Sequence, residues 1–132
     1  MKVVIQRVSS ASVTIDNKIV ADIQKGLLVL VGIEEADTQE DIDWLVGKIT
    51  QIRIFGDENE VMNLSIQDID GDIIVVSQFT LQASTKKGNR PSYIKAAKPE
   101  IAIPIYENFV KSLEFKMNKK VQTGVFGADM KV

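Results

Sequence analysis

The sequence predicts an α+β fold with a mostly antiparallel sheet and two main helices. Short apolar or alternating segments are separated by turn signals, a pattern typical of strands joined in hairpins. Two longer segments, one capped by Asp37 or Thr38 and the other over 98–116, carry apolar residues at helical spacing. These helices are inserted between groups of strands instead of alternating with single strands. The length of 132 residues favours one domain over 1–132.

The first part of the chain is predicted to form strands. Residues 2–14 alternate between apolar and polar positions, as a half-buried strand does. The turn signal at 16–18 (Asp-Asn-Lys) is followed by a return strand over 19–23. The segment 26–32 is continuously apolar between its two glycines, so we expect this strand to be covered on both faces.

The first helix is predicted from its cap and its apolar stripe. Asp37 or Thr38 can cap the first turn, and the acids that follow favour the positive end of the helix dipole. Trp44 is off the stripe, so we expect it at the edge of the stripe or in an interface. The stripe consists of Ile42, Leu45, Val46, Ile49 and Ile52.

Turns and strands are also predicted in the second half of the chain. A turn is expected at 56–59. A second turn at 70–71 leads into a strand over 72–79, and a final strand is expected over 121–126.

The second helix, over 98–116, contains two prolines. Pro99 suits the first helical position, where no backbone N–H is needed. Pro104 lies too far inside a regular helix that starts there, because it has no N–H and its ring clashes with the preceding turn. We therefore expect a late start or a kink.

The chain contains neither histidine nor cysteine. Catalytic groups that need an imidazole or a thiolate are therefore excluded, and no transition-metal site is predicted. The segment 68–72 is similar to the start of a calcium loop, but the twelfth position is Phe79 instead of glutamate, so we interpret it as a turn. The lack of cysteine, of a signal peptide and of a long apolar span predicts a soluble cytoplasmic protein without a membrane partner.

Positive charge is concentrated in one segment, residues 85–98, which we call the basic segment. It holds no acid and a charge of +5, whereas the whole chain carries −2. A local basic patch on an acidic body suits a small anionic target, such as the end of a nucleic acid. A solvated basic loop is the alternative interpretation. Its cations are Lys86, Lys87, Arg90, Lys95 and Lys98.

A polar cluster over 77–81 (Ser-Gln-Phe-Thr-Leu) directly follows the apolar stretch 73–76. Polar groups at the end of a buried strand are held in place and remain accessible, so this is a predicted site of chemistry. Each of these residues also has a structural interpretation. Ser77 and Thr80 can instead bond to nearby backbone groups, and Phe79 can belong to the core.

With these segments identified, the sequence resembles the D-aminoacyl-tRNA deacylases, also called D-tyrosyl-tRNA deacylases. The resemblance extends over the whole chain in the same order. The matching segments are 5–8 (Ile-Gln-Arg-Val), 26–32, 53–55 (Arg-Ile-Phe), 62–64 (Met-Asn-Leu), 75–81, 90–92 (Arg-Pro-Ser) and 122–126 (Gln-Thr-Gly-Val-Phe).

The resemblance implies a fold and an activity. The fold is α+β, with a mostly antiparallel sheet or partial barrel and two main helices. The activity is hydrolysis of the ester that joins a D-amino acid to tRNA, which releases the free D-amino acid and protects translation. Clearance of glycine from mischarged tRNA-Ala is also implied. Members are homodimers with the active site near the subunit interface, act on the aminoacyl-tRNA acceptor end and need no cofactor.

The resemblance also implies site residues. Without histidine, Thr80 has no obvious general base, so we favour a mechanism in which the protein positions the ester and the ribose 2′-hydroxyl assists. Backbone N–H groups near Phe79 and Thr80 can stabilise the oxyanion. The catalytic residues are Thr80, Ser77 and Gln78, and the substrate-binding residues are Phe79, Arg90, Lys86, Lys87, Phe126, Met130 and Arg7. Phe126 and Met130 are alternatively core residues, and Arg7 is alternatively a surface cation.

One family feature is absent from the sequence. Members continue into a last strand with an Asn-x-Pro-Val-Thr block, whose Gly-cis-Pro unit excludes L-amino acids from the partner's pocket. The sequence ends at Val132 without this block, so no residue is assigned to chiral selection. Two other functions are considered. One is a nucleic-acid-binding accessory domain without catalysis, and the other is a serine or threonine hydrolase, against which the missing Gly-x-Ser-x-Gly elbow counts.

Overall fold

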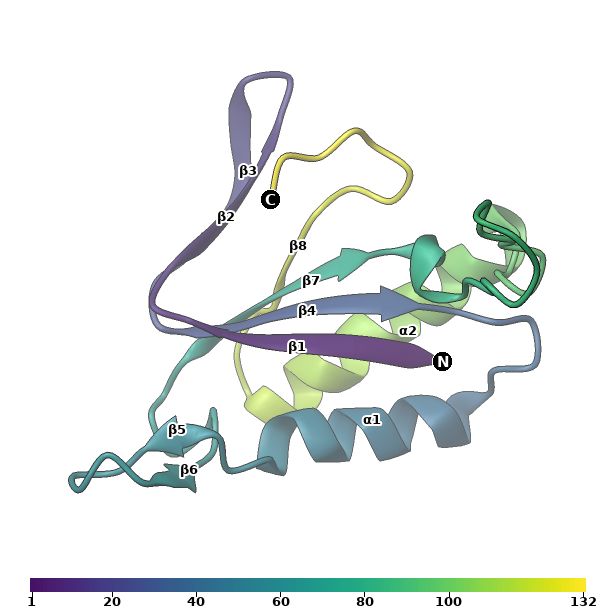
Figure 1. Cartoon of the computed structure of the whole chain (residues 1–132). Helices are drawn as coiled ribbons and strands as arrows, with labels where there is room; N and C mark the ends of the chain where they lie inside the picture. Colours follow the sequence, from purple (N-terminus) through teal and green to yellow (C-terminus); the bar gives the residue numbers. More distant parts are fainter.

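Two helices and eight strands make up the chain in a computed structural model that describes residues 1–132 (Figure 1). The strands are β1 (Lys2–Val8), β2 (Ala11–Ile15), β3 (Lys18–Ile23), β4 (Gly26–Gly32), β5 (Phe55–Gly56), β6 (Met62–Leu64), β7 (Asp72–Ser77) and β8 (Gln122–Thr123). The helices are α1 (Gln39–Gln51) and α2 (Pro99–Met117), and a short 3₁₀ turn, η1, covers Phe79–Leu81. The α+β class with two main helices is confirmed.

The main sheet has four strands in the order β1-β4-β7-β8. β1 is antiparallel to β4, but β4 and β7 are parallel, and so are β7 and β8. Parallel neighbours need a crossover connection, and the segments that contain α1 and α2 supply the two crossovers. The main sheet is therefore mixed, whereas the sequence predicts a mostly antiparallel one, and it does not close into a barrel. The antiparallel hairpins β2–β3 and β5–β6 lie outside it.

Both faces of β4 and β7 are covered. Alternate residues of each strand point to opposite faces, as the period of two requires. Val29 and Val75 pack in a cluster of 18 buried residues with the helices, whereas Ile74 and Val76 pack in a cluster of five with the β2–β3 hairpin. The prediction that strand 26–32 is covered on both faces is confirmed. The sheet is thus held between the helices and the hairpin.

Three predicted strands have different bounds in the structure. Residues 2–14 form two strands, β1 and β2, because the chain leaves the main sheet at Ser9–Ser10 and enters the hairpin. The turn at 16–18 is confirmed, and Asp16 and Asn17 adopt the positive φ angles of a tight hairpin turn. Strand 72–79 ends at Ser77, because η1 begins at Phe79. The strand expected over 121–126 is reduced to Gln122–Thr123.

The helix caps agree with the sequence, but some details differ. Thr38 is the N-cap of α1 and forms a capping box with Asp41. Trp44 is off the buried stripe, with its side chain 64% exposed, and Ile52 lies past the helix end and is also exposed. α2 begins at Pro99 and continues through the exposed Pro104, so the late start does not occur.

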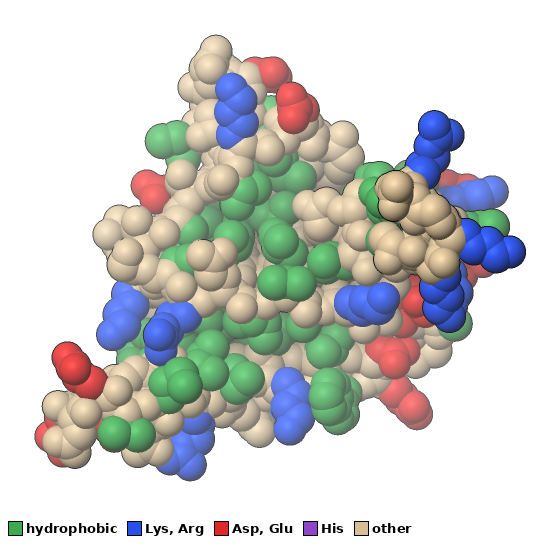
Figure 2. All heavy atoms as spheres, viewed as in Figure 1, with side chains coloured by type: hydrophobic (Ala, Val, Ile, Leu, Met, Phe, Trp, Pro, Cys, Tyr) green, Lys and Arg blue, Asp and Glu red, His purple; other side chains and the backbone are tan.

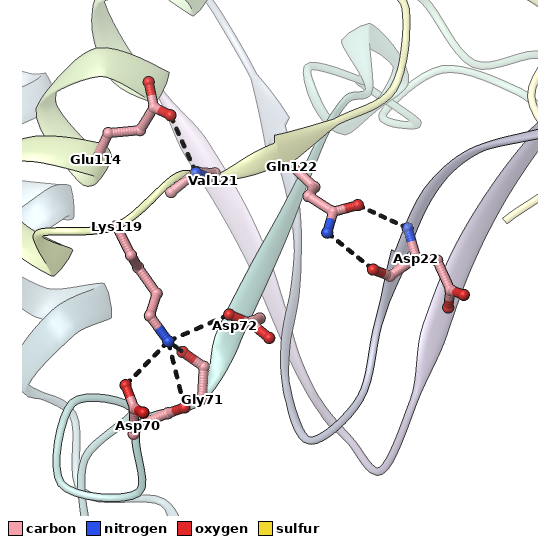
Figure 3. A network of polar contacts seen from close by, with 8 residues as sticks. All are labelled: Asp22, Asp70, Gly71, Asp72, Glu114, Lys119, Val121 and Gln122. Carbon is pink, nitrogen blue, oxygen red and sulfur yellow. Dashed lines mark hydrogen bonds and ion pairs between the residues drawn. The ribbon is translucent and has the colours of Figure 1, made fainter.

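A polar network ties the chain together at the ends of β7 and β8 that lie away from η1 (Figure 3). The ammonium of Lys119 pairs with the carboxylates of Asp70 and Asp72 at 3.0 and 3.2 Å, and also donates to the Asp70 and Gly71 carbonyls. The Gln122 side chain exchanges two hydrogen bonds of 2.7 and 2.8 Å with the backbone of Asp22 in β3. These contacts hold the start of β7 and join β8 to the hairpin.

Neither α1 nor α2 has the length and apolar character that a membrane-spanning helix needs.

Candidate active site

A cavity of about 310 Å³ opens at the carboxyl ends of β4 and β7. Parallel strands end at the same edge of a sheet, so the crossover through α1 brings the two strand ends together. The volume is at the lower end of the range typical of small-molecule sites, about 300–1,000 Å³. Its walls come from the two strand ends, the start of α2 and the last residues of the chain. They are Val31, Ile33, residues 76–79, Ala97, Ala102, residues 126–130 and Val132.

Ser77 and Gln78 bring polar groups to the cavity. Ser77 lies opposite Val31 at the last register position of β7, and its hydroxyl makes no hydrogen bond within the protein. The Gln78 backbone N–H donates to the Val31 carbonyl at 2.7 Å, which holds this residue against β4. Its side-chain amide donates to the Thr80 hydroxyl. Thr80 is not among the residues that line the cavity, but it follows Phe79, which is.

Two backbone N–H groups are free at the start of η1. In this turn Leu81 donates to the Gln78 carbonyl at 3.2 Å and Gln82 donates to the Phe79 carbonyl at 2.9 Å. The N–H groups of Phe79 and Thr80 have no acceptor in the protein. A helical turn leaves its first donors unpaired, because the carbonyls that would accept from them lie before the turn begins. Two neighbouring unpaired donors therefore follow the end of β7, and the first belongs to a residue that lines the cavity.

Close packing against β4 holds η1 in place. A Cβ atom added at Gly32 would lie 2.9 Å from the Leu81 Cβ and 3.0 Å from the Gln78 carbonyl oxygen. The buried Gln82 side chain donates to the Gly32 carbonyl at 3.0 Å, and its own oxygen has no partner. Only glycine allows this approach, so the position of the two free N–H groups depends on the residue that ends β4.

Phe79 lies on the surface and is not a core residue. Its side chain is 56% exposed and lines the cavity. Its ring makes an edge-to-face contact with Tyr93, with the ring centroids 5.4 Å apart. The core interpretation of Phe79 is therefore wrong, because η1 turns its side chain out of the sheet.

The last segment of the chain brings Phe126 and Met130 to the same cavity. Lys131 and Thr14 exchange two backbone hydrogen bonds of 2.8 Å, which attach this segment to the hairpin (Figure 1). The ring centroids of Phe126 and Tyr106 are 5.8 Å apart. The Tyr106 hydroxyl donates a hydrogen bond of 3.1 Å to the Val75 carbonyl. Burial raises the pKa of Tyr106 to about 12, so it remains a protonated donor at neutral pH.

The predicted cationic residues do not line the cavity. Lys86, Lys87 and Arg90 are exposed on a loop whose ends, Ser84 and Ser92, pair through two backbone hydrogen bonds of 2.8 and 2.9 Å. Figure 2 shows Lys and Arg side chains projecting at the right-hand edge, where Figure 1 places this loop.

Arg7 lies at the other end of the sheet. It is opposite Leu27, near the start of β4, and its guanidinium donates to the Ile54 carbonyl. The sheet therefore separates Arg7 from the cavity by most of the length of β4.

Sequence reasoning missed two residues at the site. Asp129 is the one acidic side chain that lines the cavity, and Tyr93 contacts Phe79 at its rim. Nothing in the residues around Asp129 indicates a site, because it reaches the cavity only through the fold of the last segment. Tyr93 follows the matching segment 90–92 and lies within the basic segment, and these two features could have identified it as a candidate site residue. No group of three acidic side chains gathers to hold a metal ion.

Comparison with known proteins identifies the family. A family model described as D-Tyr-tRNA(Tyr) deacylase matches residues 4–132. A Flavobacterium johnsoniae protein named D-aminoacyl-tRNA deacylase is 79% identical over the whole chain, which covers 88% of that protein. A Bacteroides fragilis protein of the same name is 67% identical with the same coverage.

Solved structures share the fold. One named c-Myc DNA Unwinding Element Binding Protein is 38% identical, with a TM-score of 0.94 over 99% of this chain and 89% of that one. Another, described as a probable eukaryotic D-amino acid tRNA deacylase, has a TM-score of 0.82 at 16% identity, over 98% of this chain and 91% of that one. The family match covers nearly the whole chain, including both segments that line the cavity. The chain therefore belongs to the D-Tyr-tRNA(Tyr) deacylase family.

Proposed function

We propose that this chain hydrolyses the ester bond that joins a D-amino acid to the terminal ribose of tRNA. The products are the free D-amino acid and tRNA, and the reaction removes mischarged tRNA before translation. The observation that carries the proposal is the pair of free N–H groups at Phe79 and Thr80, beside a cavity in a chain of the deacylase family.

The cavity has walls suited to the acceptor end. Its apolar wall, with Phe126 and Met130, suits the flat face of the terminal adenosine. Ser77 and Gln78 lie at the strand end, where a hydroxyl and an amide can bond to the ribose and the ester. The cations of the basic segment then contact phosphates farther along the strand. Arg7 serves as a brace from the other end of the sheet.

The chemistry is attack of water on the ester carbonyl. As the new carbon–oxygen bond forms, the carbonyl oxygen becomes negative and accepts from the N–H groups of Phe79 and Thr80. One such donor is typically worth about 10²–10³ in rate. The bond to the ribose 3′-oxygen then breaks, and the neighbouring 2′-hydroxyl passes the proton from water to that leaving oxygen.

Thr80 is poorly placed to act as a nucleophile. The partner of its hydroxyl is the Gln78 amide, which is a donor and cannot remove a proton. The chain has no histidine to act as a base. The Thr80 side chain instead fixes Gln78, and its backbone N–H takes part in the chemistry.

Further properties follow from the same resemblance. Glycyl-tRNA-Ala is a second substrate, because an aminoacyl group without a side chain fits wherever the ester and the amine fit. The active form is a cytoplasmic homodimer, and residues 1–132 form one deacylase domain in each subunit. β1 supports an assembly of this kind, because it pairs only with β4 and carries the exposed Val4 at the edge of the sheet.

The first experiment compares hydrolysis of D-tyrosyl-tRNA and L-tyrosyl-tRNA. Cleavage of the D-ester supports the proposal, and failure to cleave either ester contradicts it. The second experiment tests the mechanism with Thr80→Ala and with a D-tyrosyl-tRNA whose terminal ribose lacks the 2′-hydroxyl. We expect Thr80→Ala to retain most of the activity and the 2′-deoxy substrate to lose it. A covalent intermediate on Thr80 would give the opposite pattern.

A second candidate function is nucleic-acid binding without catalysis. It is favoured by the exposed basic segment and by the name of one structural neighbour, c-Myc DNA Unwinding Element Binding Protein. A pure binding protein would bind nucleic acid with strong salt dependence and would tolerate changes at both Gln78 and Thr80, so the response to a Gln78 change separates the two functions. Loss of ester hydrolysis without loss of binding on changing Gln78 would exclude it.

A further inference from the structure

Phe79 and Tyr93 form an exposed aromatic pair at the rim of the cavity. Their ring planes meet at 79°, with the centroids 5.4 Å apart. Phe79 lines the cavity and Tyr93 does not, so the pair extends the cavity wall outward onto the surface. The side chains are 56% and 39% exposed, and the Tyr93 hydroxyl makes no hydrogen bond within the protein.

This pair is not covered by another part of the chain. Ile94, which follows Tyr93, is 88% exposed. Large apolar side chains gathered on a surface are usually part of a binding site. The polar end of Tyr93 can stay in water while its ring faces a flat ligand, a combination common where aromatic side chains meet a partner.

The charge around the pair indicates the chemistry of the ligand. Tyr93 lies within the basic segment, which contains five cations and no acid. None of these five cations forms an ion pair. Proteins that bind single-stranded nucleic acid combine such unneutralised cations along the backbone with aromatic rings on which bases stack. An uncharged apolar partner would make no favourable electrostatic interaction with these cations.

We propose that Tyr93, supported by Phe79, is a stacking surface for the nucleotide that precedes the terminal adenosine of tRNA. This inference rests on the proposed function, which places the terminal adenosine in the cavity. A strand that leaves the cavity past Phe79 meets the exposed Tyr93 ring next.

Kinetics with two substrates tests the inference. D-tyrosyl-tRNA carries the preceding nucleotide, and D-tyrosyl-adenosine does not. Tyr93→Leu keeps apolar bulk against Phe79 but removes the aromatic face, and Tyr93→Phe keeps the face. Loss of a base–aromatic stack reduces affinity about 5- to 150-fold. We expect Tyr93→Leu to raise KM for D-tyrosyl-tRNA by about tenfold, within that range, and to leave KM for D-tyrosyl-adenosine unchanged. Tyr93→Phe should match the wild type on both.

Two kinetic results would overturn the inference. Equal effects of Tyr93→Leu on both substrates would mean that Tyr93 acts only by holding Phe79 in the cavity wall. No effect on either substrate would mean that no base stacks on the ring.

A binding measurement separates this inference from the proposed function. An uncharged tRNA carries 2-aminopurine at the nucleotide before the terminal adenosine, and its fluorescence falls when the base stacks. The fall should occur with the wild type and Tyr93→Phe and be absent with Tyr93→Leu. If the wild type hydrolyses neither substrate, the proposed function fails, but this signal still decides whether the base stacks on Tyr93. Equal fluorescence with all three proteins overturns the stacking.

Discussion

Replacement of Gly32 by alanine tests whether the position of η1 controls the reaction. The new Cβ would lie 2.9 Å from the Leu81 Cβ and 3.0 Å from the Gln78 carbonyl oxygen. Carbon atoms in ordinary contact are about 3.5–4.0 Å apart. The turn that carries the N–H groups of Phe79 and Thr80 must therefore move by roughly 0.5 Å or more. The φ angle of Gly32 is not in the left-handed region, so the substitution acts through this contact and not through backbone strain.

The expected effects follow from that displacement. A misplacement of about 1 Å can cost about 10² in rate, so half of it should lower kcat by about tenfold. KM should change little, because Phe126 and Met130 stay in place. Overpacking costs about 1–3 kcal/mol, which lowers Tm by roughly 4–12 °C in a chain of this size.

The measurement is D-tyrosyl-tRNA hydrolysis at a temperature well below Tm, together with thermal unfolding. Gly47→Ala is the matched control, because no atom lies within 4 Å of its added Cβ and it sits inside α1. It should raise stability by about 0.5–1 kcal/mol and leave kcat unchanged. A folded Gly32→Ala protein whose kcat stays within twofold of the wild type would refute the role given to η1.

Three further predictions concern charged residues. Asp129→Asn should raise KM for D-tyrosyl-tRNA by about two- to fivefold without changing kcat, because an exposed carboxylate that attracts the substrate ammonium contributes about 0.2–1 kcal/mol. Steady-state kinetics measures both constants, and a lower kcat would contradict this role for Asp129. Hydrogen bonding to Asp70, and to a lesser extent Asp72, raises the pKa of Lys119 above its ordinary value of 10.5. Lys119→Met should therefore lower the free energy of unfolding by about 1 kcal/mol at pH 7. This difference from the wild type should shrink above pH 10.5, because the Lys119 ammonium of the folded wild type then loses its proton. Urea unfolding at pH 7 and pH 11 measures both effects. Arg90→Ala should reduce the slope of log affinity against log salt by about one, measured by tRNA binding, and an unchanged slope would place Arg90 away from the phosphates.

Part of the candidate site could be predicted from the sequence. The end of the apolar stretch 73–76 located the polar cluster at 77–81, and the resemblance added Phe126 and Met130 from about fifty residues farther along the chain. The structure brings Ser77, Gln78 and Phe79 together with both of these residues around one cavity. Periodicity alone could not have joined these segments, because it reports only which face of an element is apolar.

Other features of the site could not be predicted. Thr80 turns its side chain toward Gln78 and offers its backbone N–H, because η1 interrupts the strand two residues early. Asp129 reaches the cavity because Lys131 pairs with the hairpin. Arg7 lies far from the cavity because β1 is antiparallel to β4. The placements of Asp129 and Arg7 depend on contacts between residues that are distant in sequence.

The sequence by itself determined the local elements and the limits of the chemistry. Turn residues, caps and apolar spacing act over a few neighbouring residues, so they are visible in the chain, as at 16–18 and Thr38. The lack of histidine and cysteine excludes whole classes of mechanism whatever the fold. Only the tertiary structure decided that β4 and β7 are parallel, that η1 packs against Gly32, and that two N–H groups stay free beside a cavity. The physical reason is that strand direction and close packing are set by how whole elements bury their apolar faces together, and local sequence patterns do not record this.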